Sequence, residues 1–122
     1  MKLTICGSIT FYREMTEVTR ALENLGHEVK IPVIGTKDAD GKEESIRMHF
    51  EKIEWSDAVL ILNYDKNGIP NYIGANTLIE MGVAFYLGKP IYLLNNIPEL
   101  GYKEEILGMK PVVIGGDFGK IV

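Results

Sequence analysis

The five residues Ala58-Val59-Leu60-Ile61-Leu62 constrain the fold of this chain more than any other stretch. A strand that is apolar on both faces is typical of the middle of a parallel sheet, because helices cover each side of such a sheet. Apolar residues recur at helical spacing on either side of this run, over 43–55 and again over about 77–87. We therefore expect an α/β protein with this run at the centre of its sheet.

The rest of the chain continues the alternation of strands and helices. Since parallel neighbours need right-handed crossover connections, the pattern predicts a doubly wound, flavodoxin- or Rossmann-like sheet of five parallel strands in the order 2-1-3-4-5. The length of 122 residues fits one domain spanning 1–122. The expected strands are 2–6, 27–33, 58–62, 91–94 and 111–114, the expected helices are 12–25, 43–55, 77–87 and 103–109, and 35–42 and 65–76 are expected loops.

Composition excludes several classes of function. A formal charge of −4 without a basic stripe argues against nucleic acid as a partner. The lone Cys6 cannot form an internal disulfide, which fits a reducing cytoplasm. The longest apolar run has five residues, far short of the roughly 20 that cross a bilayer. No His, Cys and Asp cluster occurs at ligand spacing and no Gly-x-Gly-x-x-Gly follows the first strand, so neither a metal nor a dinucleotide cofactor is expected.

The topology indicates where a ligand would bind. In doubly wound sheets the ligand lies beyond the carboxyl ends of the strands, where the winding reverses. Here that point lies between strands 2–6 and 58–62, next to Gly7-Ser8-Ile9 and the segment 63–80. Gly7 and Ser8 offer backbone N–H groups and a hydroxyl to an anion, and Arg13 can pair with a phosphate. The alternative is that Ser8 or Thr10 only caps the first helix and Arg13 is a solvated surface charge.

A motif near this point carries the strongest functional signal. The stretch Asn71-Tyr72-Ile73-Gly74-Ala75-Asn76-Thr77-Leu78-Ile79-Glu80-Met81-Gly82-Val83-Ala84 is followed by Gly88-Lys89-Pro90. The Thr-x-x-Glu-x-Gly-x-Ala core and the Gly-Lys-Pro strand start resemble the nucleoside 2-deoxyribosyltransferase family. Together with Cys6-Gly7-Ser8-Ile9, they also resemble the related deoxynucleoside 5′-monophosphate N-glycosidases. The resemblance spans most of the chain.

The resemblance implies an N-glycosidic-bond enzyme that acts on a nucleoside or its 5′-monophosphate, by transfer or by hydrolysis. The glutamate that matches Glu80 attacks the anomeric carbon of the sugar, which suits a carboxylate because that carbon develops oxocarbenium character. Small Gly82 and Ala84 are expected to let the helix approach neighbouring backbone. A structural alternative for Glu80 is a capping box, in which Thr77 caps the helix and Glu80 bonds back to its backbone N–H.

Three positions depart from the family pattern. Thr4 stands where the N-glycosidases carry a tyrosine, and His49 stands where they carry an aspartate. The transferases have a catalytic aspartate where this chain has Gly74, so Asp65 would have to reach in from its loop. A lone His49 on an apolar helix face is also typical of a half-buried structural residue. These departures keep open a second function, a non-catalytic nucleotide-binding or signalling module of the same fold.

The other candidates lie around the same edge of the sheet. Tyr72 can stack on a base and Asn71 can bond its edge, although a tyrosine packed on its own loop is an equal alternative. The candidate catalytic residues are Glu80 and Asp65, and the candidate substrate-binding residues are Gly7, Ser8, Ile9, Arg13, His49, Asn63, Asn71, Tyr72, Gly74, Asn76 and Thr77.

The aromatic residues also suggest self-association. Phe50, Trp55, Phe85 and Tyr86 exceed what one core face needs, and surplus apolar surface usually marks an interface. The family resemblance implies in addition that a neighbouring subunit completes the cleft. We therefore expect a homodimer or a higher homo-oligomer.

Overall fold

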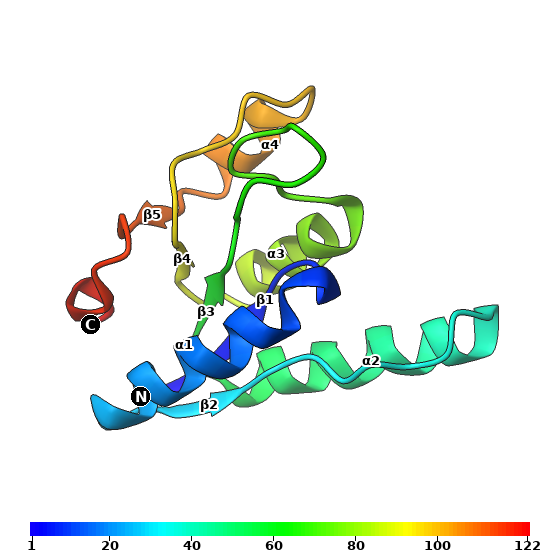
Figure 1. Cartoon of the computed structure of the whole chain (residues 1–122), viewed down its shortest axis with the longest axis horizontal. Coiled ribbons are helices and arrows are strands. Elements are labelled where there is room, and N and C mark those ends of the chain that lie inside the picture. Colours follow the sequence, from blue (N-terminus) through cyan, green and yellow to red (C-terminus); the bar gives the residue numbers. More distant parts are fainter.

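The computed structural model describes all 122 residues and has the expected topology (Figure 1). Five parallel strands pair in the order β2-β1-β3-β4-β5, so the predicted order and fold class are confirmed. The strands are β1 (Lys2–Cys6), β2 (Glu28–Lys30), β3 (Ala58–Ile61), β4 (Ile91–Leu93) and β5 (Val112–Val113), and the helices are α1 (Tyr12–Asn24), α2 (Ala39–Trp55), α3 (Ala75–Tyr86) and α4 (Lys103–Gly108).

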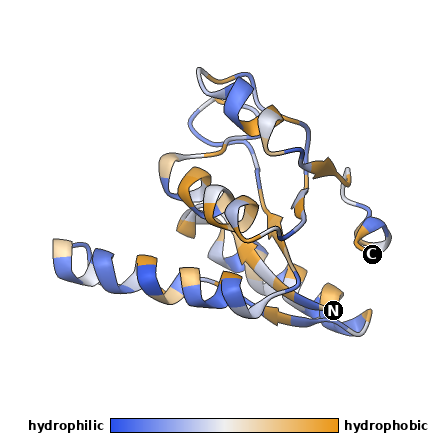
Figure 2. Ribbon diagram, turned by 180° about the vertical axis from the view of Figure 1, so that it is seen from behind, coloured by the Kyte–Doolittle hydropathy of each residue, from blue (hydrophilic) through white to orange (hydrophobic).

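Helices cover both faces of the sheet, which explains why its central strands are apolar on both sides. Met15, Val18 and Leu22 of α1 pack on one face, and residues of α2, α3 and α4 pack on the other. Side chains of a strand alternate between faces. Leu3 and Ile5 of β1 therefore join the α1 side, while Cys6 joins the opposite side. Figure 2 shows the apolar residues concentrated in the strands and the helix faces turned toward them.

Two helices begin earlier than their sequence predicted. We expected 35–42 to be a loop, but α2 begins at Ala39 because the Asp38 carboxylate caps it, accepting a hydrogen bond from Gly41 N at 2.7 Å. The first turns of α2 consequently extend away from the body of the domain (Figures 1 and 2). Helix α3 begins at Ala75, not at Thr77, with Gly74 as its N-cap residue. Both shifts change which side chains share a helix face near the site.

The segment between β2 and α2 is tied to the far end of α2. Lys52 Nζ donates a hydrogen bond to Ile31 O at 2.8 Å, and Thr4 Oγ1 donates to Lys52 O at 2.8 Å. These contacts hold the segment after β2 and the C-terminal part of α2 against β1. None of the helices is both long and apolar enough to cross a membrane.

Candidate active site

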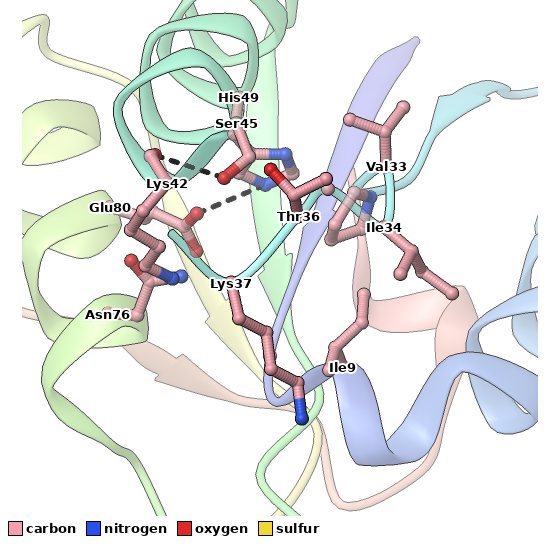
Figure 3. Close-up of a pocket in the computed structure, with 13 residues that line it drawn as sticks. Ile9, Val33, Ile34, Thr36, Lys37, Lys42, Ser45, His49, Asn76 and Glu80 are labelled. Carbon is pink, nitrogen blue, oxygen red and sulfur yellow. Dashed lines mark hydrogen bonds and ion pairs between the residues drawn. The ribbon is translucent and has the colours of Figure 1, made fainter. Parts of the chain in front are cut away.

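A cavity of about 320 Å³ opens beside the carboxyl end of β1 (Figure 3). Its size is at the lower end of the range for small-molecule sites. Because β1 lies between β2 and β3, the cavity is at the reversal of winding, as the topology predicts. The wall, however, comes from the segment after β2 and not from the loop after β3. The lining residues are Gly7, Ile9, Pro32, Val33, Ile34, Gly35, Thr36, Lys37, Lys42, Ser45, His49, Asn76 and Glu80.

Glu80 reaches this cavity from the second turn of α3. The capping-box alternative is wrong, because the helix begins before Thr77 and Gly74 makes no side-chain cap bond. The Glu80 side chain is buried, with 4% of the residue exposed, and its Oε1 has no hydrogen-bond partner. A buried carboxylate oxygen without a partner is costly for stability, so this position is better suited to binding a ligand than to holding the fold.

The environment of Glu80 keeps its carboxyl protonated at neutral pH. Burial raises its pKa from the usual 4.5 to about 8, against the opposing effects of the Lys42 charge, a Cys6 hydrogen bond and the Lys52 charge. Lys42 lines the same cavity and points toward Glu80 (Figure 3). A large shift caused by desolvation, in a carboxyl group that also has a specific cation beside it in a cavity, is typical of functional carboxylates.

His49 lies on the face of α2 that meets Glu80. Its Nε2 is 3.7 Å from Glu80 Oε2, and its Nδ1 is buried without a hydrogen-bond partner. Burial lowers the pKa of His49 from 6.5 to about 4, and the Lys52 charge adds to the effect. His49 is therefore a neutral imidazole at pH 7, fully buried in the fold yet bordering the cavity.

Cys6, the last residue of β1, completes a buried cluster with these two residues. Its Sγ lies 3.4 Å from His49 Nε2. Burial raises the pKa of the Cys6 thiol well above its usual value, and the neighbouring Glu80 raises it further. One ligand-type atom from each of Cys6, His49 and Glu80 lies within 4.8 Å of the others.

A second, smaller cavity of about 200 Å³ adjoins the first, since Gly7 and Asn76 line both. Lys66 Nζ donates a hydrogen bond to Ser8 Oγ there, at 2.8 Å. The first turn of α3 borders the same space and has no side-chain cap, so its N–H groups can donate hydrogen bonds to an anion. The residues of this cavity are Gly7, Ser8, Lys66, Tyr72, Gly74, Ala75, Asn76 and Thr77.

Four candidates from the sequence line neither cavity. The Arg13 side chain is 87% exposed and pairs with Glu17 at 3.5 Å. Asp65 does not reach in toward Gly74, because its carboxylate accepts a hydrogen bond from Asn71 N in its own loop. The Asn63 side chain is fully buried and bonds the backbone after β4. The other nine candidates border one or both cavities.

Neither the lysines of the two cavities nor the wall formed by the segment after β2 was predicted from the sequence. Lys42 and Ser45 stand seven and four residues before His49, a helical spacing that puts all three on one face of α2. That signal was readable, but only once the helix is known to begin at Ala39. No periodic pattern predicts that Lys66 lies at the second cavity, because its loop brings it to Ser8, 58 residues away in the sequence.

Comparison with solved structures places the fold among known enzymes. A 2-deoxyribosyltransferase from Bacillus psychrosaccharolyticus superposes with a TM-score of 0.61 at 20% identity, covering 76% of this chain and 71% of that chain. The CMP N-glycosidase BcmB of Clostridium botulinum gives a TM-score of 0.58 at 21% identity, covering 93% of this chain and 85% of that chain. The fold expected from the Thr77-x-x-Glu80 motif is thus confirmed.

The same fold also serves another chemistry. The flavoenzyme FerB, an NAD(P)H:acceptor oxidoreductase from Paracoccus denitrificans, superposes with a TM-score of 0.55 at 18% identity, covering 93% of this chain and 74% of that chain. No protein-family profile matches the chain, and no curated sequence matches it either. Fold alone does not decide function, which depends on the side chains of the cavity.

Proposed function

We propose that this protein is an N-glycosidic-bond enzyme of the nucleoside 2-deoxyribosyltransferase type, with Glu80 as its nucleophile. One observation carries the proposal: a buried carboxyl group, one of whose oxygens has no hydrogen-bond partner, borders a ligand-sized cavity at the reversal of the sheet winding. The 2-deoxyribosyltransferase and the CMP N-glycosidase have the two highest TM-scores of the structures described above. Their names refer to the bond between a sugar and a base, which supports the same bond as the one cleaved by this protein.

The chemistry follows from the position of Glu80. The carboxylate oxygen forms a bond to C1′ of the sugar while the C1′–N bond breaks and its electron pair leaves with the base, which takes up a proton. C1′ carries positive charge in the transition state, and an anion held beside it in a partly dry cavity stabilises that charge. Water or a second base then attacks C1′ and releases Glu80, giving hydrolysis or transfer.

Before it can attack, Glu80 must lose the proton that burial keeps on it. With a pKa of about 8, roughly one-tenth of the carboxyls are ionised at pH 7. The neighbouring imidazole of His49, 3.7 Å away, has a pKa of about 4 and is too weak a base to hold that proton, which therefore passes to solvent. Lys42 stabilises the resulting carboxylate from the cavity wall.

The second cavity supports a 5′-phosphate on the substrate. Ser8, Lys66 and the uncapped start of α3 together offer a hydroxyl, an ammonium and backbone N–H groups. Such a combination suits a doubly charged phosphate. Gly7 and Asn76 join this space to the Glu80 cavity, so one nucleoside monophosphate can span both. Tyr72, whose ring lies beneath Lys66 Nζ at 5.6 Å, borders the phosphate space instead of a base.

The second candidate is a nucleotide-binding module that has lost its chemistry. Two features favour it. His49 stands in the place of an acidic residue, and Glu80 is mostly protonated at neutral pH, a form in which a carboxyl is not a nucleophile. Ligand binding without turnover would distinguish this module from an enzyme.

The test is base release from a panel of deoxynucleosides, ribonucleosides and their 5′-monophosphates, followed by chromatography. We expect turnover of at least one member by the wild-type protein and none by Glu80→Gln. The matched control is Glu54→Gln, an exposed carboxylate on α2. Mass spectrometry of enzyme quenched during turnover should find the sugar bonded to Glu80. If calorimetry shows that a panel member binds but no base is released, the protein is a nucleotide-binding module and not an enzyme.

We also propose that the protein acts as a homodimer or higher oligomer in the cytoplasm, where its lone thiol stays reduced. Phe85 and Tyr86 at the end of α3 are 52% and 88% exposed, whereas Phe50 and Trp55 are largely covered. An interface is therefore expected over the end of α3. Light scattering should give at least twice the monomer mass of 13.7 kDa, and a Phe85→Ser, Tyr86→Ser variant should shift toward the monomer. A monomeric wild-type protein at high concentration would contradict this.

A further inference from the structure

Three side chains that the sequence keeps far apart meet behind the cavity. Cys6 comes from the end of β1, His49 from α2 and Glu80 from α3. His49 Nε2 is central: it lies 3.4 Å from Cys6 Sγ and 3.7 Å from Glu80 Oε2. A thiol, an imidazole and a carboxyl are the three side-chain types that bind zinc in proteins.

The spacing of these atoms matches a tetrahedral metal centre. Zinc bonds of about 2.3 Å to sulfur and about 2.0–2.2 Å to nitrogen or oxygen, at tetrahedral angles, place the ligand atoms about 3.3–3.6 Å apart. The observed separations of 3.4 and 3.7 Å lie around that range. The third separation, from the Cys6 thiol to the Glu80 carboxyl, lies within 4.8 Å, so a central ion would draw these two side chains toward each other.

The charge of such a complex also suits its surroundings. A divalent cation with one thiolate, one carboxylate and one neutral imidazole has no net charge, so burial does not oppose it as it opposes a lone ion. Glu80 Oε1 is buried without a hydrogen-bond partner, so the carboxyl has a free oxygen to offer a cation. The opposing groups are Lys42 and Lys52, whose positive charges act on Glu80 or His49 and disfavour a further cation.

We propose that Cys6, His49 and Glu80 form a three-ligand site for a thiophilic divalent cation such as Zn²⁺. The fourth position of the metal faces the cavity, because Glu80 and His49 border it while Cys6 lies behind them with no exposed surface. A metal would enter from the cavity, as a substrate does. An open fourth position is the arrangement of zinc sites that exchange water or ligand.

Cobalt(II) is the direct probe, because it takes the place of zinc and is coloured. Titration of the reduced, metal-free protein with Co²⁺ should give a thiolate-to-cobalt charge-transfer band and the visible bands of tetrahedral cobalt, saturating at one ion per chain. Zn²⁺ should then bleach both. Cys6 is the only cysteine, so any thiolate band belongs to it. Absence of the band in folded wild-type protein would overturn the proposal.

Variants test each ligand separately. Cys6→Ser should remove the charge-transfer band, and His49→Gln and Glu80→Gln should each weaken cobalt binding by about a hundredfold or more, since even residues that only orient a ligand contribute about 10- to 100-fold. His27→Gln is the matched control, because it removes the other histidine, which contacts the N-terminal amine, and should change nothing. Lys42→Met should tighten binding. Circular dichroism checks that each variant folds, and a band that survives both His49→Gln and Glu80→Gln would place the metal elsewhere.

A consequence follows that rests on the proposed function. A cation held by Glu80 occupies the nucleophile, so Zn²⁺ should inhibit base release and a chelator should restore it. The two proposals fail separately: cobalt spectra without any turnover leave the metal site standing, and turnover without cobalt spectra leaves the glycosidic chemistry standing. Zinc that binds by the spectral test yet leaves base release unchanged would remove this inhibitory role.

Discussion

His49 Nε2 and Glu80 Oε2 face each other at 3.7 Å inside the fold, with the two residues only 3% and 4% exposed. Burial acts in opposite directions on an acid and on a base: it raises the pKa of Glu80 to about 8 and lowers that of His49 to about 4. Between these values the pair is uncharged. The cavity therefore borders a carboxylic acid and a free base that stay un-ionised until a ligand changes their surroundings.

The first prediction concerns the pH dependence of catalysis. In the proposed mechanism the nucleophile is the ionised form of Glu80, so kcat/KM should rise about tenfold per pH unit below pH 8 and level off above it. His49, with its pKa of about 4, stays neutral over this range and adds no second inflection. The measurement is the rate of base release from pH 5.5 to 9.5. A profile that is flat across pH 8 would contradict Glu80 as the group that must ionise.

A pair of lysine variants assigns that inflection. Lys42 lowers the pKa of Glu80, whereas Lys37 lines the same cavity but its side chain points away from the carboxyl (Figure 3). Lys42→Met should move the inflection to higher pH, because the carboxylate loses a neighbouring positive charge. Lys37→Met should leave it in place, whatever it does to KM. Equal shifts in both variants would mean that the inflection reports the overall charge of the cavity.

The second prediction concerns stability. The pKa of Glu80 is higher in the folded chain than its usual 4.5, so its favourable contribution is complete below about pH 4.5 and is lost as pH rises to about 8. His49 has the opposite sign: its folded pKa of about 4 lies below 6.5, and stability falls as pH drops from 6.5 toward 4. The two slopes oppose each other from about pH 4.5 to 6.5, and only the Glu80 slope remains above that.

Glu80→Gln isolates the first of these slopes. Gln carries no charge at any pH, so the variant should gain stability relative to wild type as pH rises from about 4.5 to 8, by at most about 1.4 kcal/mol per pH unit. Paired urea denaturation at several pH values measures the difference. Parallel curves for the two proteins would show that Glu80 has an ordinary pKa.

The fold could be predicted from the sequence because its signals are local and repeated. The doubly apolar run at Ala58 and the alternation around it determine a parallel sheet, and the strand order follows from crossover geometry. The position of the cavity, at the carboxyl end of β1 where the winding reverses, was also predicted from the strand order. The helix starts did not, because Asp38 and Gly74 are caps whose role depends on turns that the preceding loops make.

The side-chain partners in the site were harder to predict. Glu80 was found through its motif, but the meeting of Cys6 with His49 joins residues 43 positions apart and leaves no spacing signal. For Gly82 the sequence predicted a contact that the structure lacks. It was expected to permit close helix packing, yet it is exposed and nothing lies within 4 Å of an added Cβ. Which face of a helix turns inward depends on the whole fold.

The third prediction compares two glycines. A Cβ on Gly41 would lie 1.7 Å from Thr36 Oγ1 and 2.8 Å from Thr36 O, so Gly41→Ala must displace the segment that walls the cavity. We expect a loss of about 1–3 kcal/mol and weaker ligand binding. Gly82→Ala has open space in an exposed helix and should stabilise by about 0.5–1 kcal/mol. Urea denaturation measures both, and a neutral Gly41→Ala would mean that the wall yields easily.

The last prediction identifies the phosphate cation. The sequence pointed to Arg13, but that side chain is 87% exposed and paired with Glu17, while Lys66 Nζ lies at the second cavity on Ser8 Oγ. A charge-assisted contact contributes about 1.5–3 kcal/mol, so Lys66→Met should weaken binding of a 5′-monophosphate by about ten- to a hundredfold and leave its nucleoside unaffected. Arg13→Ala is the matched control and should change neither ligand. Calorimetry with both ligands on the three proteins measures this. A selective loss in Arg13→Ala would move the phosphate onto the surface of α1, and equal losses for both ligands in Lys66→Met would mean that Lys66 acts by holding the loop after β3 against Ser8.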